Sequence, residues 1–404
     1  MSNQKVAYDW SSLREQFNLE KDLIHIGSSQ FISSHPMYIH KAIERYRSEL
    51  DKNPTKFTEN NEKDYAQDVR IKASKYLGME NPNHIALTDS ATMGLGIIYT
   101  GLNLQRGQEI LSSEHNHYSQ QEAIKRATDR TSATYREIPI YDHLSSVTEE
   151  EIVDKVLKQI GDNTKAIGIT WVHSDTGLKM PISKISDALL KINEKREESE
   201  KILLIVDGVH GFGIEKETFE ELGCDFFITS GHKWLYGPRG TGLIAATSEA
   251  WQHVYPVIPS FRIMNEVSKK QSRPEKMDGK QMTPGGFHAM EHRWALKEAF
   301  EFMEKIGKHR IYNRVHELTR QAKEGLASMN HVCLHTPMED RLSAGIIAFE
   351  VKGQTSKQAV QKLYEKKIVA TVAPYRSEYV RITPGIFNTP EEIDRVLQAI
   401  QDLK

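Results

Sequence analysis

The stretch ITSGHKWLYGPRGTG, from Ile228 to Gly242, places Lys233 between an apolar run and a glycine-rich turn. A lysine in such a position must lose part of its hydration or gain a partner. Burial and cationic neighbours lower the pKa of a lysine, and the neutral amine is a nucleophile. Lys233 is therefore the first candidate for a reactive group.

Apolar runs alternate with amphipathic segments on both sides of Lys233, from about residue 83 to residue 247. Short apolar strands that alternate with helices are typical of a parallel sheet covered on both faces. We therefore predict an α/β fold with a mostly parallel sheet, and a long charged helix at 182–200. The predicted strands are HIALT (84–88), EILSS (109–113), AIGITWV (166–172), ILLIVDGV (202–209), DFFITS (225–230) and GLIAAT (242–247).

The pattern changes after about Val254, where a long irregular passage is rich in Pro, Gly and charge. A strong helical stretch follows, at roughly 291–329. The remaining segments predict a smaller α+β domain, in the order AGIIAFEV (strand), SKQAVQKLYEKK (helix), IVATVA (strand), YVRIT (strand) and TPEEIDRVLQAIQDL (helix). We predict an N-terminal segment (1–30), a large domain (31–300) and a small C-terminal domain (301–404).

The composition is that of a globular protein, with 404 residues, 38% hydrophobic and 27% charged residues, and a formal net charge of −2. This balance gives no electrostatic reason to expect nucleic acid or an anionic membrane as a partner. The polar start and the lack of a long apolar run favour a cytoplasmic protein. The two cysteines, Cys224 and Cys333, form neither a CxxC pair nor a disulfide framework.

Polar residues gather after five of the predicted strands, and ligands of an α/β sheet bind at the carboxyl ends of its strands. Each residue taken singly has an ordinary explanation as a turn or helix cap. Metal binding is an alternative, but no HxxxH or HExxH spacing occurs, and the charge of Lys233 would repel a cation. We therefore expect no metal. The histidines considered are His115, His117, His173, His210 and His232.

Pyridoxal phosphate is the cofactor that needs all of these residue types. It requires a lysine for a Schiff base, an acid for its pyridinium nitrogen and hydrogen-bond donors for its phosphate. Asp207 follows one apolar strand, and the helix N-terminus at Ser90–Thr92 offers a phosphate site. We therefore expect this cofactor, with Lys233 held as an imine.

The set Asp207-Gly208-Val209-His210, with Lys233 lying 26 positions after the acid in SGHKWLYGPRGTG, resembles the class V aminotransferases of fold-type I. The similar branch holds cysteine desulfurases, isopenicillin N epimerase-like proteins and C–S lyases. The resemblance runs from about residue 24 to residue 403. It implies a large cofactor-binding domain with a mostly parallel sheet, plus a smaller α+β domain.

The resemblance also implies roles for individual residues. Lys233 would form the Schiff base, Asp207 would bind the pyridinium nitrogen and His210 the ring hydroxyl, while His115 would stack on the ring as a catalytic residue. Thr283 would contact the phosphate of a partner subunit, which implies a homodimer, and Arg381 would bind the substrate α-carboxylate. The other expected cofactor contacts are Ala91, Thr92, Ser174, Ser230 and His232, and the other expected substrate contacts are His117, Tyr118 and His173.

Two departures from the family pattern bear on the reaction. Desulfurases carry a reactive cysteine shortly before the arginine, whereas KIVATVAPYRSEYVRI (367–382) contains none. Ser174 replaces the usual asparagine near the ring. We therefore predict a lyase that eliminates the β-substituent of a cysteine conjugate or its sulfoxide, without an enzyme persulfide. Transamination, epimerisation and decarboxylating or oxidative chemistry remain alternatives, and a non-catalytic regulator is disfavoured because no DNA-binding segment precedes the fold.

Overall fold

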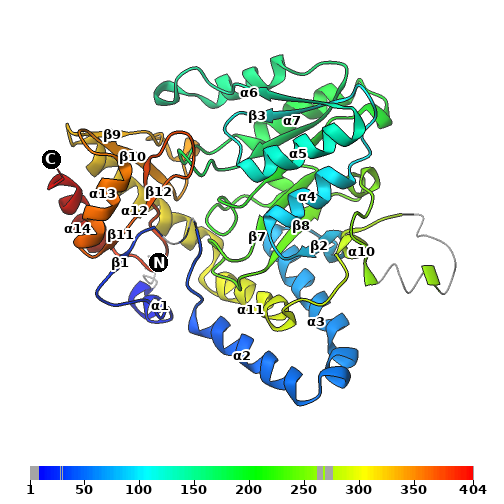
Figure 1. Cartoon of the computed structure of the whole chain (residues 1–404), viewed down its shortest axis with the longest axis horizontal. Coiled ribbons are helices and arrows are strands. Elements are labelled where there is room, and N and C mark those ends of the chain that lie inside the picture. The colour runs from blue at the N-terminus through cyan, green and yellow to red at the C-terminus, as the bar shows by residue number, and fades with distance from the viewer. Residues whose placement is uncertain (1–8, 28, 30, 262–266, 269–275, 404) are drawn as a thin grey trace, which may run out of the picture.

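A seven-stranded sheet forms the centre of the large domain (Figure 1). The computed structural model describes residues 9–27, 29, 31–261, 267–268 and 276–403. The strand order is β2-β8-β7-β6-β5-β3-β4, and only β8 runs antiparallel to its neighbours. This arrangement confirms the predicted α/β class. The strands are β2 (Ile85–Thr88), β3 (Glu109–Ser113), β4 (Thr134–Ile138), β5 (Thr164–Thr170), β6 (Leu203–Asp207), β7 (Phe226–Ser230) and β8 (Gly242–Ala246).

The inner strands are largely apolar because helices bury both faces of the sheet, whereas the edge strand β4 (TYREI) is partly exposed. Successive side chains of a strand point to opposite faces. In β6, Leu204 and Val206 belong to one buried cluster, whereas Leu203 and Ile205 belong to another. The second cluster includes side chains of α4 (Ala91–Gly101) and α5 (Tyr118–Thr131). The first includes side chains of α2 (Met37–Lys52), α3 (Pro54–Leu77), α6 (Glu149–Lys158), α7 (Ile182–Asn193), α8 (Phe219–Leu222) and α11 (Met290–Ile306).

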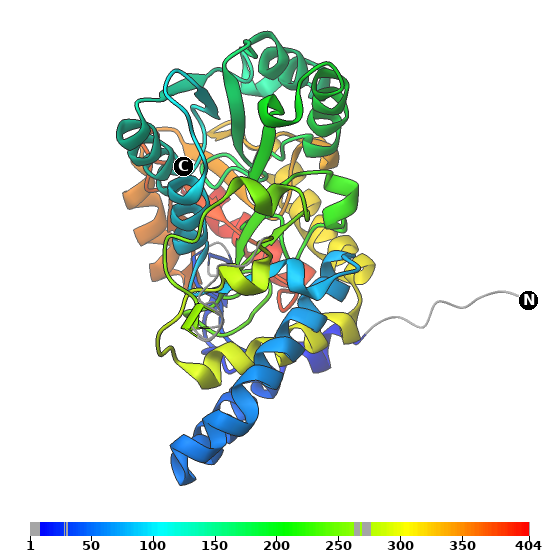
Figure 2. The same cartoon turned by 90° about the vertical axis from the view of Figure 1, so that its right-hand side faces the viewer.

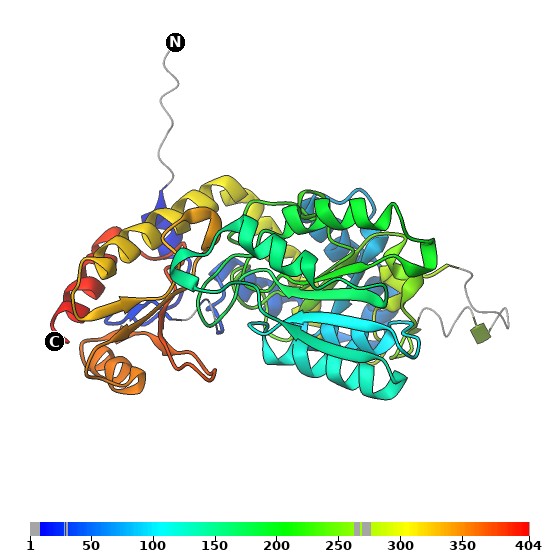
Figure 3. The same cartoon turned by 90° about the horizontal axis from the view of Figure 1, so that it is seen from above.

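The small domain lies beside the large one and has its own antiparallel sheet, in the order β12-β13-β10-β9 (Figure 3). A separate pair joins β1 (Ile24–His25) in parallel to β11 (Ile368–Val369), so the predicted N-terminal segment contributes to the small-domain core. The remaining small-domain elements are β9 (Val332–Leu334), β10 (Ile347–Val351), β12 (Thr371–Val372), β13 (Val380–Ile382), α12 (Lys308–Ala327), α13 (Ser356–Glu365) and α14 (Pro390–Gln401). The exact domain boundaries stay a prediction.

Several elements differ from the sequence expectations. The predicted helical stretch 291–329 is divided into α11 and α12 at Gly307, whose φ of 97° no helix tolerates. The predicted helix 182–200 ends as α7 at Asn193. The α2–α3 hairpin was not predicted, and its far end stands away from the rest of the molecule (Figure 2). Part of the predicted irregular passage, 262–266 and 269–275, lies outside the described residues.

The last helix matches its predicted start. Thr389 caps α14, accepting a hydrogen bond from the Glu392 backbone N–H while the Glu392 side chain accepts one from the Thr389 backbone N–H. Pro390 occupies the first turn, where its missing N–H costs nothing. Across the part of the chain that the structure describes, no helix combines the length and apolar character needed to span a bilayer.

Candidate active site

A cavity of about 380 Å³ opens at the carboxyl edge of the seven-stranded sheet. Its wall comes from the segments that follow β2, β3, β5, β6 and β7, and from the small-domain loop that precedes β13. This volume falls in the range of small-molecule sites. The predicted residues Ala91, Thr92, His117, Tyr118, Ser174, Asp207, His210, Ser230, His232, Lys233 and Arg381 all line it.

Lys233 lies in a tight turn directly after β7. The Gly237 backbone N–H donates to the Gly231 carbonyl at 2.8 Å, and the Tyr236 N–H donates to the Lys233 carbonyl at 3.1 Å. Tyr236 holds a positive φ of 55°, which a non-glycine residue adopts at a cost. The turn therefore aims the Lys233 side chain into the cavity while Trp234 and Tyr236 are fully buried behind it.

Burial and a nearby cation make Lys233 a good nucleophile. Burial, together with the charge of Arg381, lowers its pKa to about 8, although Asp207 acts in the opposite direction. A larger fraction of this amine is neutral at physiological pH than for an ordinary lysine. The geometry thus supports the reactive role expected of this residue.

His210 lies beside the lysine, with its Nε2 atom 3.2 Å from Lys233 Nζ. The Trp234 indole N–H, which can only donate, faces His210 Nδ1 at 3.3 Å. Burial first, and then the charge of Lys233, lower the pKa of His210 well below its ordinary value. The ring is therefore neutral, with its proton on Nε2 toward the cavity.

Asp207 ends β6 and is almost fully buried. Burial raises its pKa to about 6, although the Val209 backbone N–H donates to Oδ1 at 3.1 Å and the Lys233 charge favours ionisation. No ion pair of Asp207 is present among the described residues. A buried carboxyl of this kind is stabilised by a cationic N–H partner, which a pyridinium nitrogen provides.

The N-terminus of α4 faces the same cavity. Ser90 caps the helix by accepting from the Met93 N–H at 3.1 Å, and the Ala91 N–H donates to Ser230 Oγ at 2.8 Å. Thr92 and His232 complete this part of the wall. A helix N-terminus with hydroxyl groups is a favourable environment for a phosphate.

The structure places His117, rather than His115, in the cavity wall. Asn116 fixes the loop after β3, because its side chain donates to the Gly168 carbonyl at 2.7 Å and accepts from the Thr170 N–H at 2.8 Å. His117 therefore turns inward, whereas the His115 ring stacks on Tyr141 at 4.7 Å outside the wall. His115 thus lies outside the wall of this structure, and its expected stacking on the cofactor stays a prediction.

Arg381 extends from β13 into the cavity and is nearly fully buried. Its Nη1 donates to the Ser174 carbonyl and its Nη2 to the Val372 carbonyl, whereas Nε finds no hydrogen-bond partner in the described part of the chain. Burial lowers its pKa to about 10. Among the described residues it forms no ion pair, and a buried cation without a counterion is costly. An anionic ligand would remove that cost.

Ser174 belongs to a turn between the two domains. Thr336 Oγ1 donates to the Thr176 carbonyl at 2.6 Å, and the φ of Gly177 is 75°. A Cβ on Gly177 would lie 2.2 Å from the Ile346 carbonyl oxygen, so only glycine fits. Ser174 reaches the cavity, but the fully buried His173 does not. The expected substrate contact of His173 stays a prediction.

Thr283 also lies outside this cavity. Its Oγ1 accepts from Arg70 Nη2 at 3.0 Å and from the Leu87 N–H at 3.1 Å, and donates to the Gly279 carbonyl at 3.2 Å. It lines a second cavity of about 310 Å³ together with Arg70 and Arg293. Its expected contact across a dimer interface stays a prediction.

Six residues of the wall were not predicted as site residues: Phe31, Ser119, Thr170, Val209, Pro374 and Tyr375. Tyr375 lies in the segment 367–382, which stands out in the sequence only for its lack of a cysteine. The next residue, Arg376, is exposed and lies outside the cavity. The position of Tyr375 six residues before Arg381 was the only signal available.

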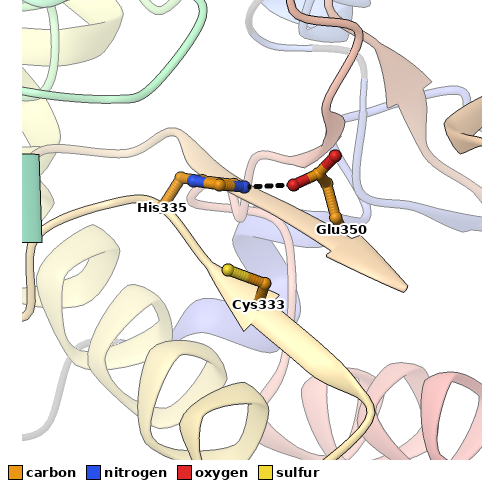
Figure 4. Close-up of side chains that lie close together, drawn as sticks. All are labelled: Cys333, His335 and Glu350. Carbon is orange, nitrogen blue, oxygen red and sulfur yellow. Dashed lines mark hydrogen bonds and ion pairs between the residues drawn. The ribbon is translucent and has the colours of Figure 1, made fainter. Parts of the chain in front are cut away.

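The small domain carries a separate cluster of metal-ligand residue types, Cys333, His335 and Glu350 (Figure 4). Their donor atoms lie within 4.8 Å of one another, and His335 Nε2 pairs with Glu350 Oε2 at 2.7 Å. Cys333 and Glu350 are exposed. None of the three lines the cavity, so the cluster takes no part in the site described above.

The fold and the site together define a pyridoxal-phosphate enzyme of fold-type I. The aminotransferase class-V model matches residues 33–396, and the chain belongs to this family. Its cofactor is pyridoxal 5′-phosphate. The residues of the cavity fit that group, because lysine, buried acid and helix N-terminus converge there.

Two curated relatives illustrate the range of activities within the family. The chain is 25% identical to the isopenicillin N epimerase of Streptomyces clavuligerus over 98% of both chains. It is 22% identical to a probable cysteine desulfurase of Vibrio cholerae, over 82% of this chain and 81% of that protein.

Solved structures show the same fold. The cystine C–S lyase C-DES, in complex with cysteine persulfide, gives a TM-score of 0.84 at 20% identity, covering 95% of this chain and 98% of that one. A cysteine desulfurase from Thermococcus onnurineus gives a TM-score of 0.82 at 18% identity, covering 97% of both chains.

Proposed function

We propose that the protein is a lyase that breaks the Cβ–S bond of an S-substituted cysteine or its sulfoxide. The observation that supports this best is a cavity that combines Lys233 with Arg381 and is lined by no cysteine; among the described residues, Arg381 forms no ion pair. Lysine and arginine suit the α-carbon and α-carboxylate of an amino acid. A desulfurase would need a thiol here to accept sulfur.

The chain's own residues divide the work of this reaction. When bound, the cofactor supplies an electron sink for the bonds at the substrate α-carbon. Lys233 Nζ accepts the Cα proton, and Asp207 holds a cationic ring nitrogen. Arg381 orients the substrate through its carboxylate. The leaving sulfur departs with the electrons of the Cβ–S bond.

Transamination is the main alternative. A dicarboxylate keto acid would be recognised best by a second cationic side chain, and Arg381 is the only arginine in the cavity wall that the structure describes. This feature favours elimination. Epimerisation and decarboxylating or oxidative chemistry use the same lysine and arginine, so the products must distinguish them.

A product assay tests the proposal directly. The pure protein is incubated with S-substituted cysteines and their sulfoxides, and we expect pyruvate, ammonia and a sulfur product in equal amounts. Conversion of the cofactor to its amine form, reversed by a keto acid, would instead identify a transaminase. Deuterium incorporation at Cα without pyruvate would identify an epimerase, and carbon dioxide release would identify a decarboxylating enzyme.

We also propose a homodimer. Phe287 and Phe261 are exposed and make an edge contact, with ring centroids 6.2 Å apart, close to Thr283 in sequence and space. Exposed aromatic side chains of this kind favour a protein interface. Sedimentation or light scattering would measure the mass, and a monomer at micromolar concentration would contradict the proposal.

Replacing either cysteine should leave turnover near that of the wild type. Cys224 is buried beside β7, where burial raises its thiol pKa, and Cys333 lies on the small-domain surface. Neither thiol lines the cavity. Steady-state rates of Cys224→Ala and Cys333→Ala would measure this. A large loss of activity in a folded Cys333→Ala variant would indicate sulfur transfer through the enzyme.

The two histidines after β3 should behave differently when replaced. We propose that His117, which lies in the wall, contacts the cofactor ring, whereas His115 supports the loop from behind. His117→Ala should shift the visible absorbance of the bound cofactor and lower turnover by about 10²-fold or more. His115→Ala should leave the absorbance unchanged. The reverse pattern would restore the family-based assignment of His115.

A further inference from the structure

Tyr375 lies in the cavity wall on the substrate side of Lys233. It belongs to the loop between β12 and β13, and its ring stands edge-on to His117 with centroids 6.2 Å apart. The loop therefore brings a phenol from the small domain to a cavity built mostly by the large domain. It occupies the segment in which a desulfurase would carry its cysteine.

Ser174 connects Tyr375 to the carboxylate site. The Ser174 and Tyr375 hydroxyl groups are hydrogen-bonded to each other, and the Ser174 carbonyl accepts from Arg381 Nη1. Either hydroxyl can donate in this pair. When Ser174 donates, the Tyr375 O–H is free to donate into the cavity. The phenol is thus positioned relative to the arginine that orients the substrate.

The phenol remains protonated under physiological conditions. Burial raises the pKa of Tyr375 to about 12, although Ser174 and the Arg381 charge act in the opposite direction. A protonated phenol donates a hydrogen bond but does not act as a base. Because a thiol is a stronger acid than this phenol, Tyr375 keeps its proton when a thiolate forms beside it.

Other side chains near Arg381 are less suited to donate a hydrogen bond to a leaving sulfur atom. Burial lowers the pKa of His117 to about 4, and its Nδ1 is already in contact with Ser119 Oγ at 2.7 Å. Tyr118 is 64% exposed and therefore remains hydrated. In the proposed reaction, Lys233 already binds the cofactor and accepts the Cα proton.

We propose that Tyr375 Oη donates a hydrogen bond to the sulfur, or to the sulfoxide oxygen, on the substrate β-carbon and so determines specificity. This inference rests on the proposed lyase function. The Cβ–S bond breaks with its electron pair on sulfur, and the Cα proton passes to Lys233 Nζ. The leaving thiolate takes a proton from water, and water hydrolyses the three-carbon product to pyruvate and ammonia.

The test compares Tyr375→Phe with the wild type on S-aryl cysteines whose leaving thiols differ in acidity. A hydrogen bond to developing charge matters most for a basic leaving group. We expect the variant to lose about 10- to 150-fold in kcat with the most basic thiolate and little with a nitro-substituted one. The dependence of rate on thiol pKa becomes steeper, which a merely structural role would not produce.

Tyr379→Phe is the matched control, because that phenol lies on the same loop but stacks on His335 at 4.0 Å, outside the cavity. Its rates should match those of the wild type across the series. An unchanged dependence on thiol acidity in Tyr375→Phe, with pyruvate still released by the wild type, would overturn the inference while leaving the lyase proposal intact.

A binding measurement separates the two proposals. Cysteate and alanine are titrated into the holoenzyme and their dissociation constants are measured by calorimetry. Cysteate carries oxygens on its sulfur, whereas alanine has no sulfur. The ratio of the alanine to the cysteate dissociation constant should therefore be about tenfold smaller in Tyr375→Phe than in the wild type. If the wild type releases no pyruvate, the lyase proposal fails, and the binding preference alone decides the role of Tyr375. An unchanged preference overturns it.

Discussion

Replacing Lys233 with alanine should abolish covalent attachment of the cofactor and lower turnover by more than about 10³-fold. The pure wild-type protein should be yellow, with an absorbance band that borohydride removes and converts to a stable adduct at Lys233. The variant removes both the amine that binds the cofactor carbonyl and the base for the α-proton. Visible absorbance and mass spectrometry after reduction measure the loss.

Lys308→Ala is a matched control for this experiment. Burial also lowers the pKa of Lys308 to about 8, but its Nζ lies over the Tyr76 ring, away from the cavity. This variant should keep the band. If Lys233→Ala still forms a borohydride-reducible, protein-bound adduct when no amine is added, another lysine binds the cofactor.

The pH dependence of cofactor capture follows from the lowered pKa of Lys233. Only the neutral amine attacks a carbonyl, so the rate at which the apoprotein binds pyridoxal phosphate covalently should rise as the pH increases through about 8. An ordinary lysine would place this rise near 10.5. Stopped-flow absorbance distinguishes the two values.

Replacing Arg381 with alanine should raise the apparent KM for an α-amino acid by about 30-fold to several thousand-fold, the equivalent of ~2–5 kcal/mol for a truncated buried charge pair. Arg381 forms no ion pair among the described residues, so we expect the substrate carboxylate to supply the counterion that a buried cation requires. Arg381→Lys keeps the charge but loses the bidentate contact with the carboxylate. Its apparent KM should therefore lie between those of the wild type and Arg381→Ala.

Arg376→Ala provides the comparison for Arg381, because Arg376 lies in the loop just before β13, exposed and outside the cavity. Its kinetics should stay near those of the wild type. Steady-state assays that compare an amino acid with its amide, which lacks the carboxylate, measure how much each arginine contributes to carboxylate binding. Equal kinetics for Arg381→Ala and the wild type would move the carboxylate site elsewhere.

The sequence alone determined six of the seven strands of the large sheet, all but β4, and the residues that follow them. Strand β3 was predicted as observed, and β2, β5, β6, β7 and β8 were each placed to within about two residues. These strands are buried on both faces, so their apolar runs are continuous and stand out from the amphipathic helices. Because parallel strands end at one edge, Asp207 and Lys233 were expected to meet, and they do.

Only the tertiary structure decided which neighbours of these residues face the cavity. His115 and His117 are separated by one residue, and the choice between them depends on the bonds of Asn116 to Gly168 and Thr170 in the next strand. Tyr375 meets Ser174 across 201 positions of sequence. Periodicity reports which face of its own strand or helix a residue occupies. It carries no information on a loop side chain, whose direction is set by contacts with segments that are distant in sequence and that meet only in the folded structure.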